Sequence, residues 1–135
     1  MRSQLDDNLI ISGQISAEDV AIAAREGVTM IVNNRPDHED PEQPLASEIE
    51  EAAAAAGVAY RHVPILRGIG PGEVEEMRGA LEAAGDGKVM AFCRSGTRSA
   101  MVCALAQREM GVERGEVERR LSAAGFDSAP IQHLL

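Results

Sequence analysis

The segment from Val89 to Ser99 holds the residues best suited to chemistry. It reads Val89-Met90-Ala91-Phe92-Cys93-Arg94-Ser95-Gly96-Thr97-Arg98-Ser99, an apolar run followed by a short polar loop and the start of a second apolar segment. A cysteine between the end of a strand and the first turn of a helix faces unpaired backbone N–H groups and the positive end of the helix dipole. These groups, together with Arg98, favour the thiolate, which is the nucleophilic form of cysteine. We therefore expect Cys93 to be a catalytic nucleophile.

The N–H groups of such a loop also bind anions. The sequence predicts an anion-binding loop in which Arg98 contacts the ligand, and the other members are Arg94, Ser95, Gly96, Thr97 and Ser99. Gly96 allows a backbone conformation or a close approach that a Cβ atom would obstruct. Two side chains keep alternatives open. Arg94 points either to the ligand or to solvent, and Ser99 either caps the following helix or donates a hydrogen bond to the Cys93 thiolate.

Residues 33–44 contain three prolines and no apolar side chain, which is typical of a long surface loop. This loop is acidic, but its acidic residues and histidine lack a paired ligand spacing, so we expect a solvated loop and no metal site. The residues are Asp37, His38, Glu39, Asp40 and Glu42. Arg35 is expected to pair with Asp37 or with the turn that follows it.

Four further residues have simpler interpretations. Cys103 stands in an apolar segment and is expected to be a small buried hydrophobic residue. His62 and His133 are isolated and are expected to be structural. Arg67 stands among Gly68 and its neighbouring glycines, from where it could reach an anionic substrate.

Short apolar runs alternate with longer helical segments along the chain. The runs at 9–11, 30–32, 60–63 and 89–92 predict strands buried on both faces, and the segments after Ser16 and at 45–56, 71–84 and 99–110 predict helices. Two short helices at 115–124 and 128–135 complete the chain. Ser16 and Asp19 have the spacing of a helix capping box. The pattern predicts an α/β fold with three layers, α/β/α, around a four-stranded, mainly parallel sheet, and sites on such sheets lie beyond the carboxyl ends of the strands.

The composition is that of one globular domain spanning residues 1–135. Hydrophobic residues make up 44% and charged residues 26% of the chain, and the net charge of −9 disfavours nucleic acid as a partner. One Tyr, two Phe and no Trp cannot form a base-stacking platform. The chain has no membrane-spanning apolar run, and its first residues lack the apolar core of a secretory signal, so we expect a cytoplasmic protein. Two cysteines are too few for a disulfide framework or a zinc site, and no cofactor is expected.

Several motifs together resemble a known family. The loop from Cys93 to Ser99 is similar to the anion-binding loops of cysteine phosphatases and rhodaneses. In order along the chain, Asn34-Arg35-Pro36-Asp37, Gln43-Pro44, Tyr60 with Val63-Pro64, and the Cys93 loop resemble the bacterial beta-lactamase-hydrolase-like phosphatase-like domain. The resemblance extends from about Leu9 to the C-terminus. It implies a dual-specificity-phosphatase-like fold and either phosphatase or sulfurtransferase activity.

Two departures from the phosphatase pattern favour sulfur transfer. The phosphatase signature places five residues between Cys and Arg, whereas four separate Cys93 from Arg98, and the shorter loop suits sulfur donors. The position where the resemblance places a proton-donating Asp reads Ile65-Leu66-Arg67-Gly68-Ile69-Gly70. The leading hypothesis is a sulfurtransferase that carries a persulfide on Cys93 and takes a small sulfur donor. The first alternative is a phosphatase for a phosphorylated substrate, with Asp37 or Asp40 as general acid, and the second is a non-catalytic anion-binding module.

Overall fold

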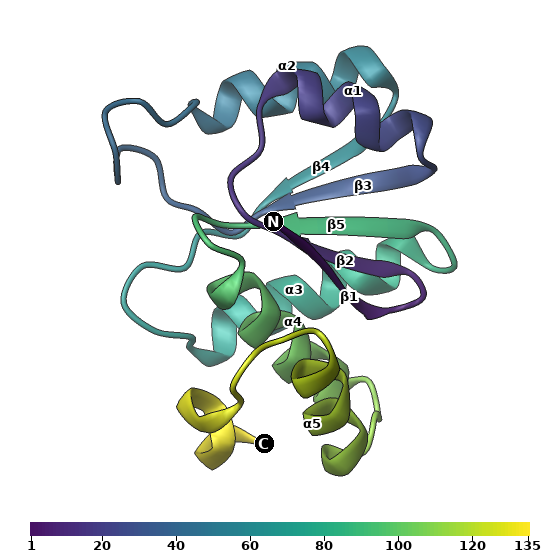
Figure 1. Cartoon of the computed structure of the whole chain (residues 1–135), viewed down its shortest axis with the longest axis vertical. Helices are drawn as coiled ribbons and strands as arrows, with labels where there is room; N and C mark the ends of the chain where they lie inside the picture. The colour runs from purple at the N-terminus through teal and green to yellow at the C-terminus, as the bar shows by residue number, and fades with distance from the viewer.

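The computed structural model describes residues 1–135 and contains a five-stranded sheet (Figure 1). The strands lie in the order β1-β2-β5-β3-β4. Their bounds are Arg2–Asp6 for β1, Leu9–Ser12 for β2, Val28–Asn33 for β3, Ala59–His62 for β4 and Lys88–Phe92 for β5. β1 pairs antiparallel with β2, and all other pairs are parallel.

Helices cover both faces of this sheet and produce two separate apolar clusters. α1 (Ala17–Arg25) and α2 (Ala46–Ala56) pack on one face, and α3 (Pro71–Ala84), α4 (Thr97–Glu109) and α5 (Arg114–Ala123) lie on the other (Figure 1). A short 3-10 helix, η1 (Ala129–Leu134), ends the chain against α4. Neighbouring β2 residues alternate between the clusters, with Ile10 on the α1 side and Ile11 on the α4 side. The predicted three-layer α/β/α fold is confirmed.

The predicted number of strands is wrong, because β1 was not expected. Among its five residues only Leu5 is buried, so β1 has no apolar run that would mark it as a strand. Backbone pairing with β2 at the edge of the sheet stabilises it instead. The expectation that the strand near residue 60 is buried on both faces is also wrong. β4 is the opposite edge strand, and the side chains of Ala59 and Arg61 are exposed.

α4 is the most deeply buried helix, as the apolar pattern predicts. Nine consecutive residues, Ser99 to Gln107, are buried. The helix begins at Thr97, two residues before the expected start, with Gly96 as its N-cap residue. Ser99 is therefore in the first turn, and its interpretation as the N-cap is wrong. At α1, by contrast, the predicted capping box between Ser16 and Asp19 is confirmed.

The ends of four strands lie in one row and position the loops that follow them. Ser12 of β2 and Asn33 of β3 are both paired with Phe92 of β5, and His62 of β4 is paired with Asn33. The segments after these residues emerge at the same edge of the sheet, on the left in Figure 1. This edge is where the loop of Cys93 and the loop of residues 34–45 meet.

No helix of the chain has the length and hydrophobicity needed to cross a bilayer.

Candidate functional site

Cys93 directly follows β5 and lies beneath the loop that leads into α4. Its side chain is fully buried, and the backbone N–H of Gly96 donates a hydrogen bond to its Sγ at 3.2 Å. Gly96 adopts φ +93°, and a Cβ atom there would lie 2.9 Å from Met1 Cε and 3.2 Å from Ile11 Cγ2. The backbone angle therefore requires glycine, and a Cβ atom would in addition press on Ile11. The loop thus directs a backbone donor at the sulfur.

The remaining loop residues surround this sulfur from the solvent side. Arg94, Ser95 and Thr97 are exposed, and the Arg94 carbonyl accepts a hydrogen bond from Gln14 N–H at 3.1 Å. Ser95 Oγ donates to Thr97 Oγ1 at 3.4 Å. The structure brings the predicted loop residues together, and their contact with an anion stays a prediction.

Arg98 lies near Cys93 and is held by a carboxylate. Its guanidinium donates to Glu39 at 2.7 and 2.9 Å and to the carbonyl of Ile65 at 2.9 Å. The pKa of Arg98 is raised, chiefly by its hydrogen bonds to Glu39, and the nearby Cys93 adds to the effect. The positive charge of Arg98 therefore faces the sulfur of Cys93. The Glu39 carboxylate already accepts the strongest hydrogen bonds of this guanidinium.

Glu39 corrects the expectation that the acidic loop is merely solvated. Its carboxylate accepts hydrogen bonds from both Arg98 and Arg35, which is 4% exposed. The hydrogen bond from Arg98 is the main reason why the pKa of Glu39 falls from 4.5 to about 2, and Arg35 adds to the effect. Glu39 is thus ionised at neutral pH. The four-residue spacing of Arg35 and Glu39 was the only feature of the sequence that indicated the ion pair between these two residues.

Arg35 is confirmed to pair with the turn that follows it. Besides Glu39, it donates to Gln14 Oε1 at 3.0 Å, and its carbonyl lies 2.9 Å from His62 Nε2. His62 therefore has the structural role expected of it. Together these contacts fasten the acidic loop to the ends of β2 and β4.

Asp37 and Asp40, the predicted candidates for a general acid, have local partners. Asp37 Oδ1 accepts from the backbone N–H of Ala46 at 2.7 Å, at the start of α2. Asp40 Oδ1 accepts from the backbone N–H of Glu42 at 2.9 Å. Neither carboxylate is hydrogen-bonded to residues 93–98. The structure gives Asp37 the role of a helix cap, which carboxylates at N-termini commonly fill.

Asn34 is a positioning residue to which the sequence assigned no role of its own, although it belongs to the motif Asn34-Arg35-Pro36-Asp37. Ser99 Oγ donates to its Oδ1 at 2.7 Å, and its Nδ2 donates to the carbonyl of Val63 at 2.9 Å. Its backbone N–H also donates to the carbonyl of Phe92 at 2.8 Å. The buried Asn34 side chain thus ties the first turn of α4 to the ends of the strands. Ser99 uses its hydroxyl for this contact, so the predicted hydrogen bond from Ser99 to the Cys93 thiolate is not formed.

The second cysteine behaves as expected. Cys103 is fully buried in the apolar cluster around α4, and burial raises the pKa of its thiol. Cys93, by contrast, is the thiol in this chain that has polar partners.

No three His, Cys, Asp or Glu side chains lie close enough together to hold a metal ion.

Comparison with known proteins agrees with this geometry. Residues 2–110 match the family described as beta-lactamase hydrolase-like protein, phosphatase-like domain. Beta-lactamase hydrolase-like proteins of Xylella fastidiosa and Agrobacterium fabrum are 38% and 32% identical to the chain over 125 and 128 residues, which are 91% and 92% of its length. The chain spans 29% of the length of each of these relatives.

Solved structures show the same fold. A crystal structure from Neisseria meningitidis, described as that of a candidate phosphatase, has a TM-score of 0.80 at 32% identity, covering 98% of this chain and 94% of that one. A structure of Tk-PTP in the active form has a TM-score of 0.70 at 21% identity, covering 98% and 92%. The fold is thus that of cysteine-dependent phosphatase-like proteins. The chain belongs to the phosphatase-like domain family of the beta-lactamase hydrolase-like proteins.

Proposed function

We propose that this protein is a sulfurtransferase that carries a persulfide on Cys93. With thiosulfate, the Cys93 thiolate forms a bond to the outer sulfur, the bond between the two thiosulfate sulfurs breaks, and sulfite leaves with the electron pair. The outer sulfur of the persulfide then passes to an acceptor such as cyanide, which leaves as thiocyanate and restores the thiolate. The Gly96 N–H and the other backbone donors of the loop stabilise the negative charge at each stage.

The observation that carries this proposal concerns the proton that phosphate ester hydrolysis requires. A leaving alkoxide needs a general acid, and an effective one has a pKa near the working pH. Glu39 is the carboxylate hydrogen-bonded to this loop, and its pKa of about 2 leaves it without a proton. Sulfite leaves as a stable anion and needs no such donor. The site therefore fits sulfur transfer better than ester hydrolysis.

The length of the loop supports the same choice. Four residues separate Cys93 from Arg98, so the loop curls closely around the sulfur, and the Gly96 N–H reaches Sγ itself at 3.2 Å. The Arg98 guanidinium, which would balance the charge of a phosphate, is bound to Glu39 by two hydrogen bonds. A phosphate dianion would have to displace that carboxylate.

Phosphomonoester hydrolysis is the second candidate and the one that the comparisons favour, because the family is described as phosphatase-like and the Neisseria meningitidis structure described as that of a candidate phosphatase is 32% identical to the chain. In that reaction Cys93 would form a phosphocysteine, and Asp37 or Asp40 would have to leave its present partner to protonate the leaving oxygen.

Two parallel assays decide between the candidates. After incubation with thiosulfate, intact mass spectrometry should show one added sulfur atom on the wild-type protein and none on Cys93→Ser, and cyanide should remove it as thiocyanate. Hydrolysis of a phosphotyrosine peptide with kcat/KM above about 10⁴ M⁻¹s⁻¹ and no added sulfur would establish the phosphatase instead. Absence of both reactions would leave an anion-binding module.

A one-residue insertion tests the loop argument. Adding a glycine between Gly96 and Thr97 restores five residues between Cys93 and the arginine. We expect slower persulfide formation and faster hydrolysis of an aryl phosphate, with circular dichroism as the control for folding.

A further inference from the structure

A largely apolar cavity adjoins the Cys93 loop and is not used by the chemistry described above. Its volume is about 480 Å³, within the range of small-molecule sites. Thr97 and Arg98 line it, and Arg98 also donates to the carbonyl of Ile65, another lining residue. The cavity therefore opens beside the first turn of α4, next to the reactive loop.

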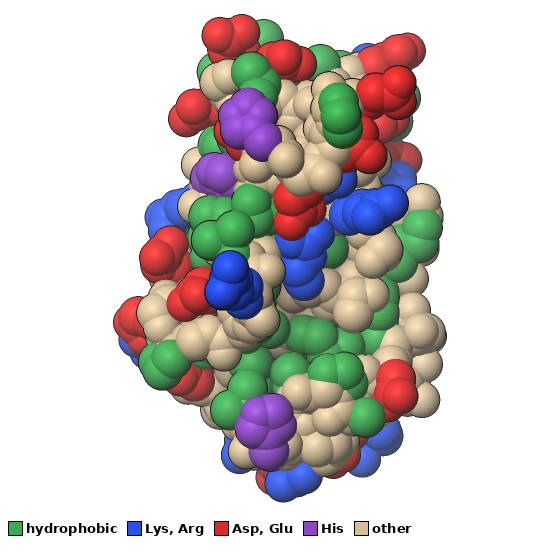
Figure 2. Space-filling view, turned by 90° about the vertical axis from the view of Figure 1, so that its left-hand side faces the viewer, with side chains coloured by type: hydrophobic (Ala, Val, Ile, Leu, Met, Phe, Trp, Pro, Cys, Tyr) green, Lys and Arg blue, Asp and Glu red, His purple; other side chains and the backbone are tan.

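Three segments supply the apolar lining. Ile65, Met101 and Ile131 are 1%, 3% and 3% exposed and form its buried part. Leu66 and Leu134 stand at its rim with 74% and 49% exposure, and they are two of the six large hydrophobic side chains that the chain leaves exposed. Figure 2 shows hydrophobic side chains gathered below the basic ones on this face of the molecule. An apolar ligand group would cover the exposed leucine side chains.

The charge of the cavity is opposite to that of the chain. The protein has a net charge of −9, yet the lining contains Arg67, Arg98 and His133 and no acidic residue. The side chain of Arg67 forms no hydrogen bond or ion pair within the chain. Arg98 is already paired with Glu39, so Arg67 supplies the unpaired positive charge for an anion, while the rest of the cavity complements an apolar body.

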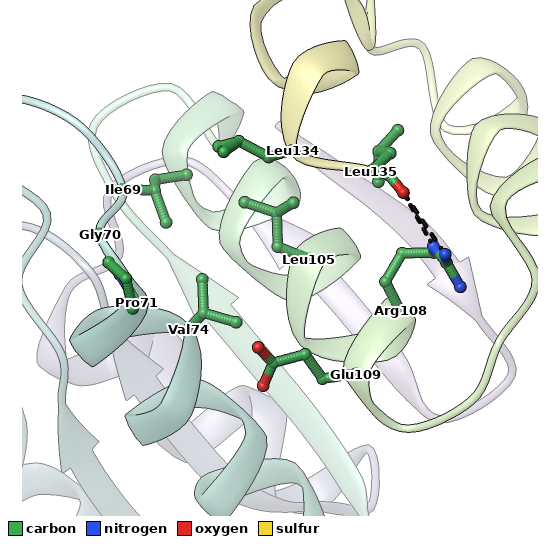
Figure 3. A pocket seen from close by; sticks show the side chains of 9 residues that line it. All are labelled: Ile69, Gly70, Pro71, Val74, Leu105, Arg108, Glu109, Leu134 and Leu135. Carbon is green, nitrogen blue, oxygen red and sulfur yellow. Dashed lines mark hydrogen bonds between the residues drawn. The ribbon is translucent and has the colours of Figure 1, made fainter.

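A second cavity lies farther along α4 and has a different charge pattern. It has a volume of about 320 Å³ and shares Ile69 and Leu134 with the first. Its charged groups, Arg108 and Glu109, lie at its edge, and the Arg108 guanidinium donates to the carbonyl of Leu135 (Figure 3). This second cavity extends the apolar surface, and its one cation already has a protein partner. Arg67, whose side chain has no partner within the chain, lines the first cavity, so an anionic head group is better placed there.

We infer that the cavity formed by the 65–69 segment, the first turns of α4 and the 130–134 segment binds the apolar substituent of an anionic sulfur donor, of the alkanethiosulfonate class R–SO₂–S⁻. This inference rests on the proposed function. The Cys93 thiolate forms a bond to the terminal sulfur, the bond from that sulfur to the sulfonyl group breaks, and the sulfinate R–SO₂⁻ leaves with the electron pair. The anionic head lies at the loop while the chain R lies along Met101 towards Leu134.

The test is a series of donors that differ only in chain length. With cyanide as acceptor, kcat/KM is measured for thiosulfate and for methane-, butane-, hexane- and octanethiosulfonate. Each methylene that enters the cavity should raise kcat/KM about fourfold, until the chain fills the available space. Equal values for the methane and octane compounds would overturn the inference.

Three matched variants test whether the effect of donor chain length on kcat/KM arises in this cavity. Leu134→Asp and, independently, Leu66→Asp place a charge at the exposed rim and should lower the octane-to-methane ratio of kcat/KM about tenfold or more. Ile22→Asp is the control, because Ile22 is 38% exposed and belongs to α1, on the opposite face of the sheet. It should leave the ratio unchanged. A ratio that falls equally in all three variants would contradict the proposed location.

A binding experiment separates this inference from the proposed function. Octanesulfonate contains no transferable sulfur, and its binding to Cys93→Ser is followed by chemical shift changes at residues 65–69, 97–101 and 130–134. Binding there without sulfur transfer by the wild type would refute the proposed function and support the cavity. Sulfur transfer without octanesulfonate binding would support the function and refute the cavity.

Discussion

The two cysteines of this chain are ten residues apart and equally buried, yet their surroundings differ in kind. Cys103 lies in the middle of α4 within the apolar cluster, where burial raises the pKa of its thiol. Cys93 lies outside that cluster, accepts a hydrogen bond from Gly96 N–H and faces Arg98. Burial alone thus does not decide whether a thiol reacts. The two buried sulfur atoms differ in whether polar groups of the protein lie next to them.

The largest expected effect comes from exchanging each cysteine in turn. Cys93→Ser should lower sulfur transfer to cyanide on the order of 10³-fold or more, because no other thiol can carry the persulfide. Cys103→Ala should keep the activity and lower the free energy of unfolding by about 1 kcal/mol, as expected for a small deletion in the core. Thiocyanate formation and urea denaturation measure the two quantities. If Cys103→Ala lost the activity and Cys93→Ser kept it, Cys103 would be the reactive thiol.

The polar network behind Cys93 should matter more for stability than either thiol. Asn34→Ala leaves Ser99 Oγ and the carbonyl of Val63 without their buried partner, so we expect a loss of about 2 kcal/mol in the free energy of unfolding. Sulfur transfer should fall as well, because the first turn of α4 loses its support. Asn8→Ala, at an exposed turn, is the matched control and should change neither quantity. An equal effect of both substitutions would argue against a positioning role.

Asp37 distinguishes capping from catalysis. In Asp37→Ala the backbone N–H of Ala46 loses its acceptor, and we expect the free energy of unfolding to fall by about 1 kcal/mol. Sulfur transfer should change less than about twofold when measured well below the melting temperature. A loss of about 100-fold or more in hydrolysis of a phosphate ester would instead identify Asp37 as the general acid.

The smallest expected effect belongs to the ion pair of Glu39. The pKa of Glu39 is about 2 in the folded protein, below its ordinary value of 4.5, so the pair stabilises the fold above about pH 4.5. This stabilisation is lost as the pH falls through about 2. Because solvent screens the partly exposed carboxylate, we expect the free energy of unfolding of the wild type to exceed that of Glu39→Gln by only about 0.5 kcal/mol near pH 6. Urea denaturation of both proteins should show the gap closing on acidification, and a gap independent of pH would contradict this assignment.

Much of the fold follows from local features of the sequence. The apolar runs before Cys93 and in β2 and β3 predict a parallel sheet, and Ser16 with Asp19 marks the start of α1. These features depend on side-chain periodicity and on contacts between near neighbours, which a sequence contains directly. β1 was not predicted in this way, because its pairing with β2, and not its hydrophobicity, makes it a strand.

The sequence by itself determined the candidate nucleophile, the glycine of its loop and the nearby arginine, because Cys93, Gly96 and Arg98 lie within six residues. Only the tertiary structure decided the partners of these groups. Glu39 reaches Arg98 across 59 residues of chain, and Asn34 reaches Ser99 across 65. Such contacts depend on which strands are neighbours, since the order β5-β3-β4 brings the ends of distant segments to one edge of the sheet. Because of the same topology, Glu39, which the sequence suggested to be solvated, is the ionised partner of Arg98 in the Cys93 loop.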